Sequence, residues 1–188
     1  MKKSFGAKTL VFTNPVWCVG SYDVNNQPNL MTVAWGGICC SKPPAVTISL
    51  RKATYTYGNI MARMAYTVNI PSVKFVKHAD YVGMVSGKME NKFETIRLTP
   101  VKSDLVDAPY VEEFPMILEC KVIHTHEIGL HTQFIGEILD VKVDQAALDA
   151  SGQPDMNKVA PFTYDSDTQT YHRVGDAIGN AFKIGREL

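Results

Sequence analysis

Residues 27–60 read QPNLMTVAWGGICCSKPPAVTISLRKATYTYGNI, and this stretch decides the fold. After the double-proline turn, residues 46–51 alternate between aliphatic and polar side chains. A period of two is typical of a half-buried β-strand, so we expect one face of this segment in the core and the other face polar and open. Thr54 or Thr56 can cap a helix that ends near Met64. The stretch therefore predicts a strand that leads directly into a helix.

The sequence before and after this stretch adds strands in the first half of the chain. Residues 16–22 and 30–35 flank a turn that is rich in Asn and Pro, and we expect them to form a hairpin. Residues 66–70 return to a strand pattern. Ser72 can cap a second helix that ends near Gly83.

Two long strand patterns occupy the second half. Residues 116–123 and 131–143 lie on either side of a turn at Gly129 and should pair antiparallel. The apolar residues of the second strand change parity near Ile138, which predicts a β-bulge there or burial of both faces. Residues 149–170 are rich in Ser, Gly, Pro, Asp and Asn, so we expect an irregular segment able to lie across a site.

About six strands with two helices between them favour a mainly β fold, a β-barrel with a few helices, over a doubly wound parallel sheet. We find no linker or repeat and expect one domain over residues 1–188. The sequence contains neither GxGxxG nor GxxxxGK[ST], the glycine-rich loops that hold phosphates in parallel-sheet nucleotide-binding folds.

Composition narrows the choice of partner and compartment. Lys plus Arg and Asp plus Glu both number 19, so there is no positive excess to attract nucleic acid or an anionic membrane. The apolar part of the basic N-terminal stretch is broken by Asn14 and Pro15, and no apolar run approaches the roughly 20 residues of a membrane helix. The four cysteines form no CxxC pair. We therefore expect a protein of the reducing cytoplasm that binds neither nucleic acid nor membrane.

Several motifs in order along the chain resemble one family. They are PNLMTVAWGG at 28–37, a strand that ends in Ser-x-Arg at 49–51, YTVNIPS at 66–72, DYVGMVSGKMENKF at 80–93, DAPYVEEFPMILEC at 107–120 and HTQFIGEILDVKVD at 131–144. The chain resembles the flavin reductase-like family of FMN-binding split-barrel proteins, and most closely its flavoredoxin branch. The resemblance implies a Greek-key antiparallel barrel of six strands with FMN as the cofactor.

The residues themselves fit an FMN site. The cofactor's phosphate needs a cation and donors, which Arg51, Thr54 and Thr56 could supply at the start of a helix. The resemblance implies that Lys92, and more weakly Lys88, also reach the phosphate. It further implies that residues 29–35 run beside the ring and ribityl chain, that His131 lies near the flavin of a partner subunit, and that Phe162 and Tyr164 cover the ring. The complete set of expected cofactor contacts is Asn29, Met31, Thr32, Val33, Ala34, Trp35, Ser49, Leu50, Arg51, Thr54, Thr56, Lys88, Lys92, His131, Phe162 and Tyr164.

The resemblance implies a homodimer with flavin at its interface and leaves two functions open. In the first, which is favoured, the protein is a flavin-dependent oxidoreductase of the flavin reductase type that takes electrons from NAD(P)H. In the second, the protein is an electron carrier of the flavoredoxin kind that exchanges electrons with a redox protein and has no nicotinamide site. Because the flavin supplies the redox chemistry in both, no side chain is assigned as a catalytic acid or base.

A less favoured hypothesis uses the histidines. His124 and His126 lie two residues apart, hence on one face of a strand, and imidazoles on one face can chelate a metal ion. Such a metal-binding β-barrel would need a third ligand.

Overall fold

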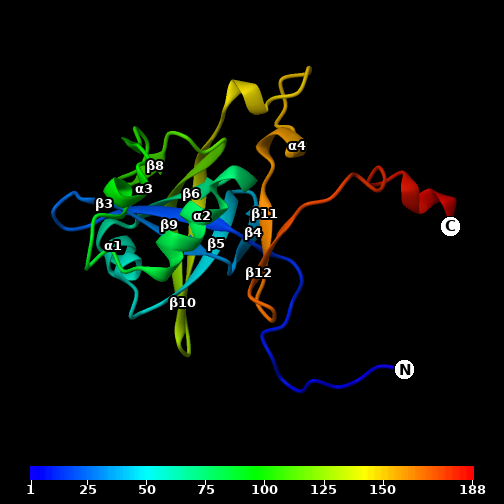
Figure 1. Ribbon diagram of the computed structural model, residues 1–188, viewed down its shortest axis with the longest axis horizontal. Helices are drawn as coiled ribbons and strands as arrows, with labels where there is room; N and C mark the ends of the chain where they lie inside the picture. Colours follow the sequence, from blue (N-terminus) through cyan, green and yellow to red (C-terminus); the bar gives the residue numbers. More distant parts are fainter.

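The computed structural model describes the backbone of residues 1–188 and every side chain except that of Glu187. Its centre is a seven-stranded sheet in the order β3-β2-β6-β9-β10-β5-β4, with every neighbouring pair antiparallel (Figure 1). The strands are β2 (Trp17–Tyr22), β3 (Pro28–Val33), β4 (Gly36–Ser41), β5 (Pro44–Arg51), β6 (Ala65–Ile70), β9 (Met116–Ile128) and β10 (His131–Val143).

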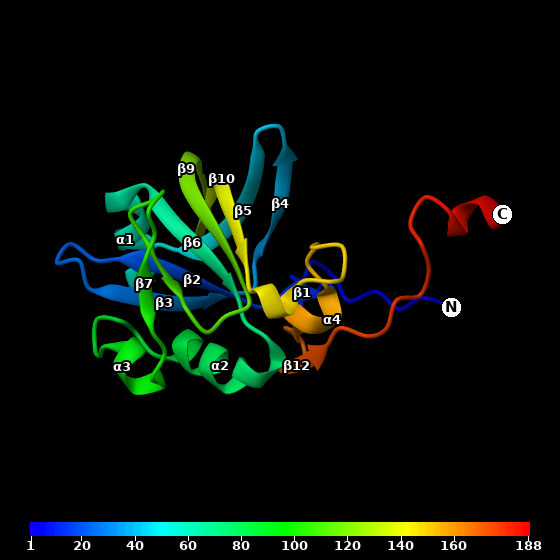
Figure 2. The ribbon, with the colours of Figure 1, turned by 90° about the horizontal axis from the view of Figure 1, so that it is seen from above.

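The two edge strands of this sheet are consecutive in the chain, and this closes the barrel. Only Ala34 and Trp35 separate β3 from β4, so one bent segment pairs with β2 at its first half and with β5 at its second half. The amide of Ser49 donates to the carbonyl of Trp35 across the bend (N···O 2.9 Å). Counting β3 and β4 as one bent strand gives six, so the expected six-stranded antiparallel barrel is confirmed (Figure 2).

The barrel interior is filled by the aliphatic face of β5 and its neighbours. Val46, Ile48 and Leu50 are buried, whereas Thr47, Ser49 and Arg51 point outward, as the alternation predicted. Burial of an aliphatic side chain of this size contributes roughly 1.5–3 kcal/mol. Inside the barrel, the hydroxyl of Tyr66 donates to the carbonyl of Val46 (O···O 3.1 Å). A side chain at Gly136 would collide with the ring of Tyr66, so only glycine fits there.

The helix after β5 forms as expected. Helix α1 (Tyr55–Arg63) begins at Thr54, whose hydroxyl accepts a hydrogen bond from the amide of Tyr57, and it ends at Met64, which has a left-handed backbone (φ 51°). The helix expected to start at Ser72 begins differently, because a short 3₁₀ turn η1 (Val73–Phe75) precedes α2 (Val76–Met84) and the Ser72 side chain makes no capping bond. Helix α2 packs against β3, where the Thr32 hydroxyl donates to the carbonyl of Ala79.

Smaller elements surround the barrel. They are α3 (Lys92–Ile96), the pair β7 (Pro100–Lys102) and β8 (Pro109–Val111), the 3₁₀ turns η2 (Gln145–Ala147) and η3 (Ile184–Glu187), α4 (Met156–Val159), and a three-stranded sheet of β1 (Asn14–Pro15), β11 (Phe162–Asp165) and β12 (Thr170–Arg173). Residues 1–13 and 174–188 extend away from the barrel on the same side (Figures 1 and 2). None of the helices in the described residues has the length and apolar character needed to cross a membrane.

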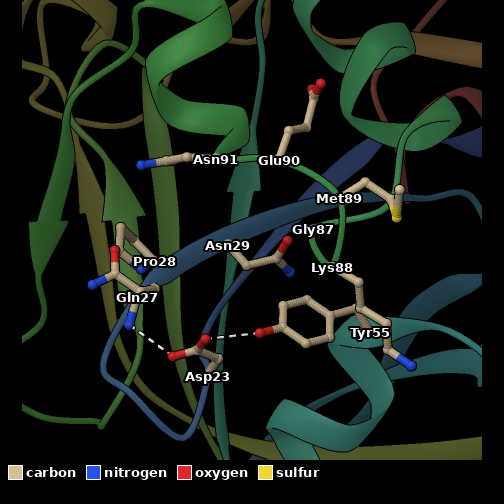
Figure 3. A pocket seen from close by; sticks show the side chains of 10 residues that line it. All are labelled: Asp23, Gln27, Pro28, Asn29, Tyr55, Gly87, Lys88, Met89, Glu90 and Asn91. Carbon is tan, nitrogen blue, oxygen red and sulfur yellow. Dashed lines mark hydrogen bonds between the residues drawn. The ribbon is translucent and has the colours of Figure 1, made fainter.

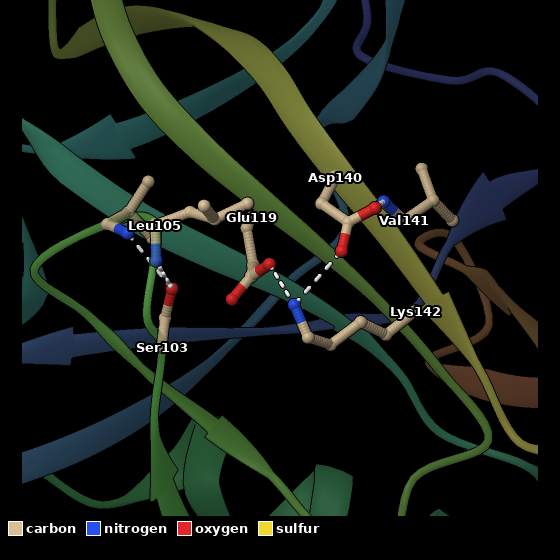
Figure 4. A network of polar contacts seen from close by, with 7 residues as sticks. Ser103, Leu105, Glu119, Asp140, Val141 and Lys142 are labelled. Carbon is tan, nitrogen blue, oxygen red and sulfur yellow. Dashed lines mark hydrogen bonds and ion pairs between the residues drawn. The ribbon is translucent and has the colours of Figure 1, made fainter.

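Hairpin β9–β10 contains the irregularity that the sequence predicted. The pairing register shifts between Ile138 and Asp140, which confirms the bulge near Ile138, and a second shift lies between Ile135 and Gly136. Next to the predicted bulge, the ammonium of Lys142 binds both the buried carboxylate of Glu119 and that of Asp140 (Figure 4). The Lys142–Glu119 pair therefore joins the two strands where their regular ladder is interrupted.

Candidate functional site

The bend between β3 and β4 and the outward face of β5 enclose a cavity of about 480 Å³, which we call the bend cavity. Because β5 alternates, Ser49 and Arg51 face this cavity while Val46 and Ile48 fill the barrel core. The lining brings together most of the cofactor contacts expected from the sequence. It consists of Met31, Thr32, Val33, Ala34, Trp35, Ser49, Leu50, Arg51, Thr54, Gly83, Leu130 and His131.

Two rings form one wall of the bend cavity. The ring centroids of Trp35 and His131 lie 4.6 Å apart at an interplanar angle of 42°. Trp35 is 40 % exposed and its neighbour at the rim, Leu130, is 63 % exposed, so the wall opens to solvent. The cavity therefore offers a flat aromatic ligand an apolar surface at the edge of the molecule.

A cation and a helix start form another wall. His131 pairs with Arg51 across strands β10 and β5, which places the guanidinium group at the end of β5 and directly before α1. Among the described side chains, no carboxylate lies within 4.0 Å of this guanidinium. The Thr54 hydroxyl donates to the Arg51 carbonyl (2.9 Å) while it caps α1. Positive charge and the amides of a helix N-terminus meet here, and this combination suits an anion such as a phosphate.

Thr56 does not join this wall. It is 1 % exposed, and its hydroxyl accepts a hydrogen bond from the side-chain amide of Asn29 (2.8 Å). Thr56 and Asn29 thus belong to the contact between α1 and the hairpin β2–β3 rather than to the bend cavity.

Asn29 and Lys88 line a separate cavity of about 430 Å³ between the β2–β3 turn, the start of α1 and the loop after α2 (Figure 3). On one side of it the Tyr55 hydroxyl donates to the Asp23 carboxylate (2.7 Å). Although partial burial raises the pKa of Asp23, hydrogen bonds from Tyr55 and from two backbone amides lower it below its ordinary value overall. Asn29 Oδ1 packs so closely on Gly87 that a side chain at position 87 would displace the Asn29 amide. Asn29 Oδ1 has no hydrogen-bond partner among the described residues.

Lys92 lies apart from all of these cavities. Its side chain is buried, and its ammonium nitrogen donates to the carbonyls of Leu30 in β3 and Val82 in α2, both at 2.8 Å. Burial lowers the pKa of Lys92 to about 8. The phosphate contact that the resemblance implies for Lys92 would require the side chain to leave these two carbonyls.

A third cavity of about 570 Å³ adjoins the bend cavity and shares Thr32, Ala34 and Gly83 with it. Tyr164 lines this third cavity, whereas Phe162 is buried with its ring edge against Tyr171 (centroids 5.6 Å apart). Phe162 thus packs in the small sheet rather than over the bend cavity.

Sequence reasoning missed two residues of the bend cavity. Gly83 faces Thr32, and a Cβ at Gly83 would lie 3.1 Å from the Thr32 Cβ, so close packing of α2 on β3 requires a small residue there. Leu130 follows Gly129 in the β9–β10 turn. The only sequence signal for Gly83 was its position at a predicted helix end, and for Leu130 its position beside a predicted turn.

The rings of His124 and His126 stack with centroids 6.3 Å apart on β9. Within the described part of the chain, no group of three or more His, Cys, Asp or Glu side chains could hold a metal ion. The metal hypothesis therefore lacks the third ligand that it needs.

Comparisons with known proteins agree with this fold. Residues 9–172 match the model of the flavin reductase like domain, so the chain belongs to the flavin reductase-like flavoprotein family. The solved flavoredoxin of Desulfovibrio vulgaris (Miyazaki F) is 53 % identical with a TM-score of 0.94, over 98 % of this chain and 100 % of that one. The flavoredoxin from Methanosarcina acetivorans is 29 % identical with a TM-score of 0.92, over 100 % of this chain and 98 % of that one. A curated ferric-chelate reductase (NAD(P)H) of Archaeoglobus fulgidus is 24 % identical over 104 residues, which are 55 % of this chain and 60 % of that protein.

Proposed function

We propose that this protein binds FMN in the bend cavity and carries electrons between redox proteins, in the manner of a flavoredoxin. The similarity to the Desulfovibrio vulgaris flavoredoxin over nearly the whole chain supports the carrier over the NAD(P)H oxidoreductase that the sequence analysis favoured. When bound, FMN supplies the redox chemistry, because it accepts a hydride or single electrons. The protein contributes binding, orientation and electrostatics.

The residues of the bend cavity fit the two ends of FMN. Arg51, unpaired among the described side chains, and the start of α1 would hold the phosphate, which carries two negative charges. Residues 31–35 and the ring of Trp35 would form the apolar wall for the flat ring system. His131 lies beside Trp35, where an imidazole could donate a hydrogen bond and stabilise negative charge on the reduced ring.

The exposure of Trp35 and Leu130 is the single observation that carries the electron-transfer role. A ring seated against Trp35 would lie at the molecular surface, where electrons can pass to a docked protein. A homodimer with the flavin at its interface would cover part of this apolar rim, and the edge of the ring outside the contact would remain the route for electrons. Light scattering of the purified protein tests the dimer directly.

Oxidation of NAD(P)H is the second candidate, and the similarity to the Archaeoglobus ferric-chelate reductase supports it. An anaerobic mixture of the yellow protein with NADH or NADPH separates the two functions. We expect the flavin absorbance to persist with either nucleotide and to bleach only when a reduced protein donor is added. Rapid bleaching by NADH or NADPH alone would show that the protein is an NAD(P)H oxidoreductase and not an electron carrier. Chromatography of the released flavin distinguishes FMN from FAD in the same sample.

Replacing Arg51 by Ala tests the phosphate end. Because a charge-assisted hydrogen bond contributes roughly 1.5–3 kcal/mol, we expect the FMN dissociation constant to rise roughly 10- to 150-fold. Quenching of flavin fluorescence on titration measures it. The neighbouring Lys52→Ala is the matched control, because Lys52 pairs with Glu127 (2.7 Å) and does not line the bend cavity. If the Arg51→Ala protein binds FMN with wild-type affinity, Arg51 does not contact the phosphate.

A further inference from the structure

The third cavity differs from the bend cavity in its charge. Its lining holds one carboxylate, that of Asp80 in α2, and no Lys, Arg or His, and we call it the Asp80 cavity. No basic group among the described side chains lies within 4.0 Å of the Asp80 carboxylate. The half-buried carboxylate therefore brings a negative charge to the Asp80 cavity without a basic partner within 4.0 Å.

Aromatic rings accompany this charge. Tyr164 and Tyr171, from the two strands of the β11–β12 hairpin, line the same cavity with ring centroids 5.5 Å apart and an interplanar angle of 44°. The Tyr171 hydroxyl donates to Asp80 Oδ1 (2.8 Å), which fixes the carboxylate beside the two rings. Burial, and then the contact with Asp80, raise the pKa of Tyr171 above its ordinary value, so this hydroxyl remains protonated. Met84, which is 70 % exposed, adds a polarisable thioether at the rim.

We propose that the Asp80 cavity is a binding site for a small organic cation, such as an N-alkylated aromatic ring. The faces of tyrosine rings attract cations, and a carboxylate held beside them adds an opposite charge. An anionic ligand is disfavoured, because it would meet the carboxylate without any basic group in the lining.

The position of the Asp80 cavity gives the cation a role. Thr32, Ala34 and Gly83 form a wall common to the Asp80 cavity and the bend cavity. A cation held by Asp80 would therefore lie next to the ligand of the bend cavity, so that the two could occupy the protein together. The cation site itself does not depend on the proposed FMN site, since Asp80, Tyr164 and Tyr171 lie outside the lining of the bend cavity.

The probe is 1-methylpyridinium, titrated into the purified protein by isothermal calorimetry at pH 8. Its partner is 4-methylpyridine, which has nearly the same shape and is largely uncharged at that pH. We expect the cation to bind at least roughly fivefold more tightly than the neutral ring, and Asp80→Asn to remove that preference, because it deletes the charge but keeps the oxygen that accepts the Tyr171 hydroxyl. Asp167→Asn, in the exposed turn of the same hairpin and outside the lining, should bind like wild type.

Three results would overturn the proposal: no binding of the cation, equal binding of the two rings, or an undiminished preference in Asp80→Asn. If circular dichroism shows that Asp80→Asn does not fold, Tyr164→Leu answers the same question, because loss of one ring should also weaken cation binding severalfold. The flavin absorbance of the same samples reports on the proposed function separately. Flavin content without cation preference rejects only the Asp80 cavity site, and cation preference without flavin rejects only the FMN site.

Discussion

At the scale of single residues, Lys92 makes stability depend on pH. Its pKa is 10.5 in its ordinary state and about 8 in the folded chain, so between these values the unfolded chain binds more protons than the folded one. The free energy of unfolding should therefore rise with pH over this interval, by as much as about 3 kcal/mol, and Lys92→Met should abolish this contribution. Urea denaturation of both proteins at pH 8, 9 and 10 measures the difference between their slopes.

The control for this prediction is Lys88→Met, since Lys88 is exposed and should leave the slope of the wild type unchanged. Parallel stability curves for wild type and Lys92→Met would show that the buried ammonium stays charged throughout. At neutral pH two effects oppose each other in Lys92→Met, because the carbonyls of Leu30 and Val82 lose their donor while the cost of burying a charged ammonium disappears.

Sequence reasoning succeeded at residues whose orientation follows from a local period. Alternation along residues 46–51 was sufficient to place Ser49 and Arg51 on the open face of β5. It failed to describe Thr56 and Lys92, which turn inward to partners far away in the sequence: Thr56 bonds Asn29, and Lys92 bonds Leu30. A local sequence pattern does not reveal a distant hydrogen-bond partner. Thr56 near a helix start and Lys92 in a polar loop were therefore both expected to be free to bind the cofactor.

At the scale of elements, the ion pair between Lys142 and Glu119 holds the bulged part of β10 against β9. Glu119 is fully buried, so Lys142→Met would leave its charge in the protein interior without a partner. Lys142 itself is 36 % exposed, and solvent weakens the pair, so we expect a loss of about 2 kcal/mol in the free energy of unfolding. Chemical denaturation at pH 7 measures this loss.

A second substitution separates charge burial from simple loss of packing. Adding Glu119→Gln to Lys142→Met removes the stranded charge, so the double variant should be more stable than Lys142→Met alone. Lys121→Met, at an exposed position of β9, should change stability by less than about 0.5 kcal/mol. If Lys142→Met behaves like Lys121→Met, the ion pairs do not stabilise the bulge.

Most elements could be predicted because each carries its own signal. The bulge near Ile138 followed from a change of parity, and α1 followed from a capping threonine. The extension of β9 to Ile128 could not be predicted in this way, because residues 124–128 are all exposed and owe their strand structure to pairing with β10. The alternation of residues 116–123 thus predicted the first part of β9, and only pairing with β10 extends the strand to Ile128.

At the scale of the whole molecule, closure of the barrel creates the bend cavity. Trp35 and His131 are 96 positions apart in the sequence and become neighbours because β4 and β10 flank β5 on either side. Strand patterns predicted a barrel but not this order of strands, and only the family resemblance implied that these two residues share a site. The family resemblance therefore predicted which distant residues lie together, whereas the hydrophobic period predicted the individual strands.

Residues 174–188 lie outside this closed unit and should contribute almost nothing to its stability. Ile178 and Phe182 are 96 % and 93 % exposed, and the backbone hydrogen bonds of residues 180–186 stay within the segment. A variant that ends at Arg173 buries the same apolar area in its barrel, so we expect its melting temperature to change by less than about 2 °C. Phe162→Ala, which empties a buried position in the adjoining sheet, should lower the melting temperature by several degrees in the same calorimetric series. A comparable drop in the shortened variant would mean that residues 174–188 pack against another molecule in solution, because their exposed side chains would then be buried there.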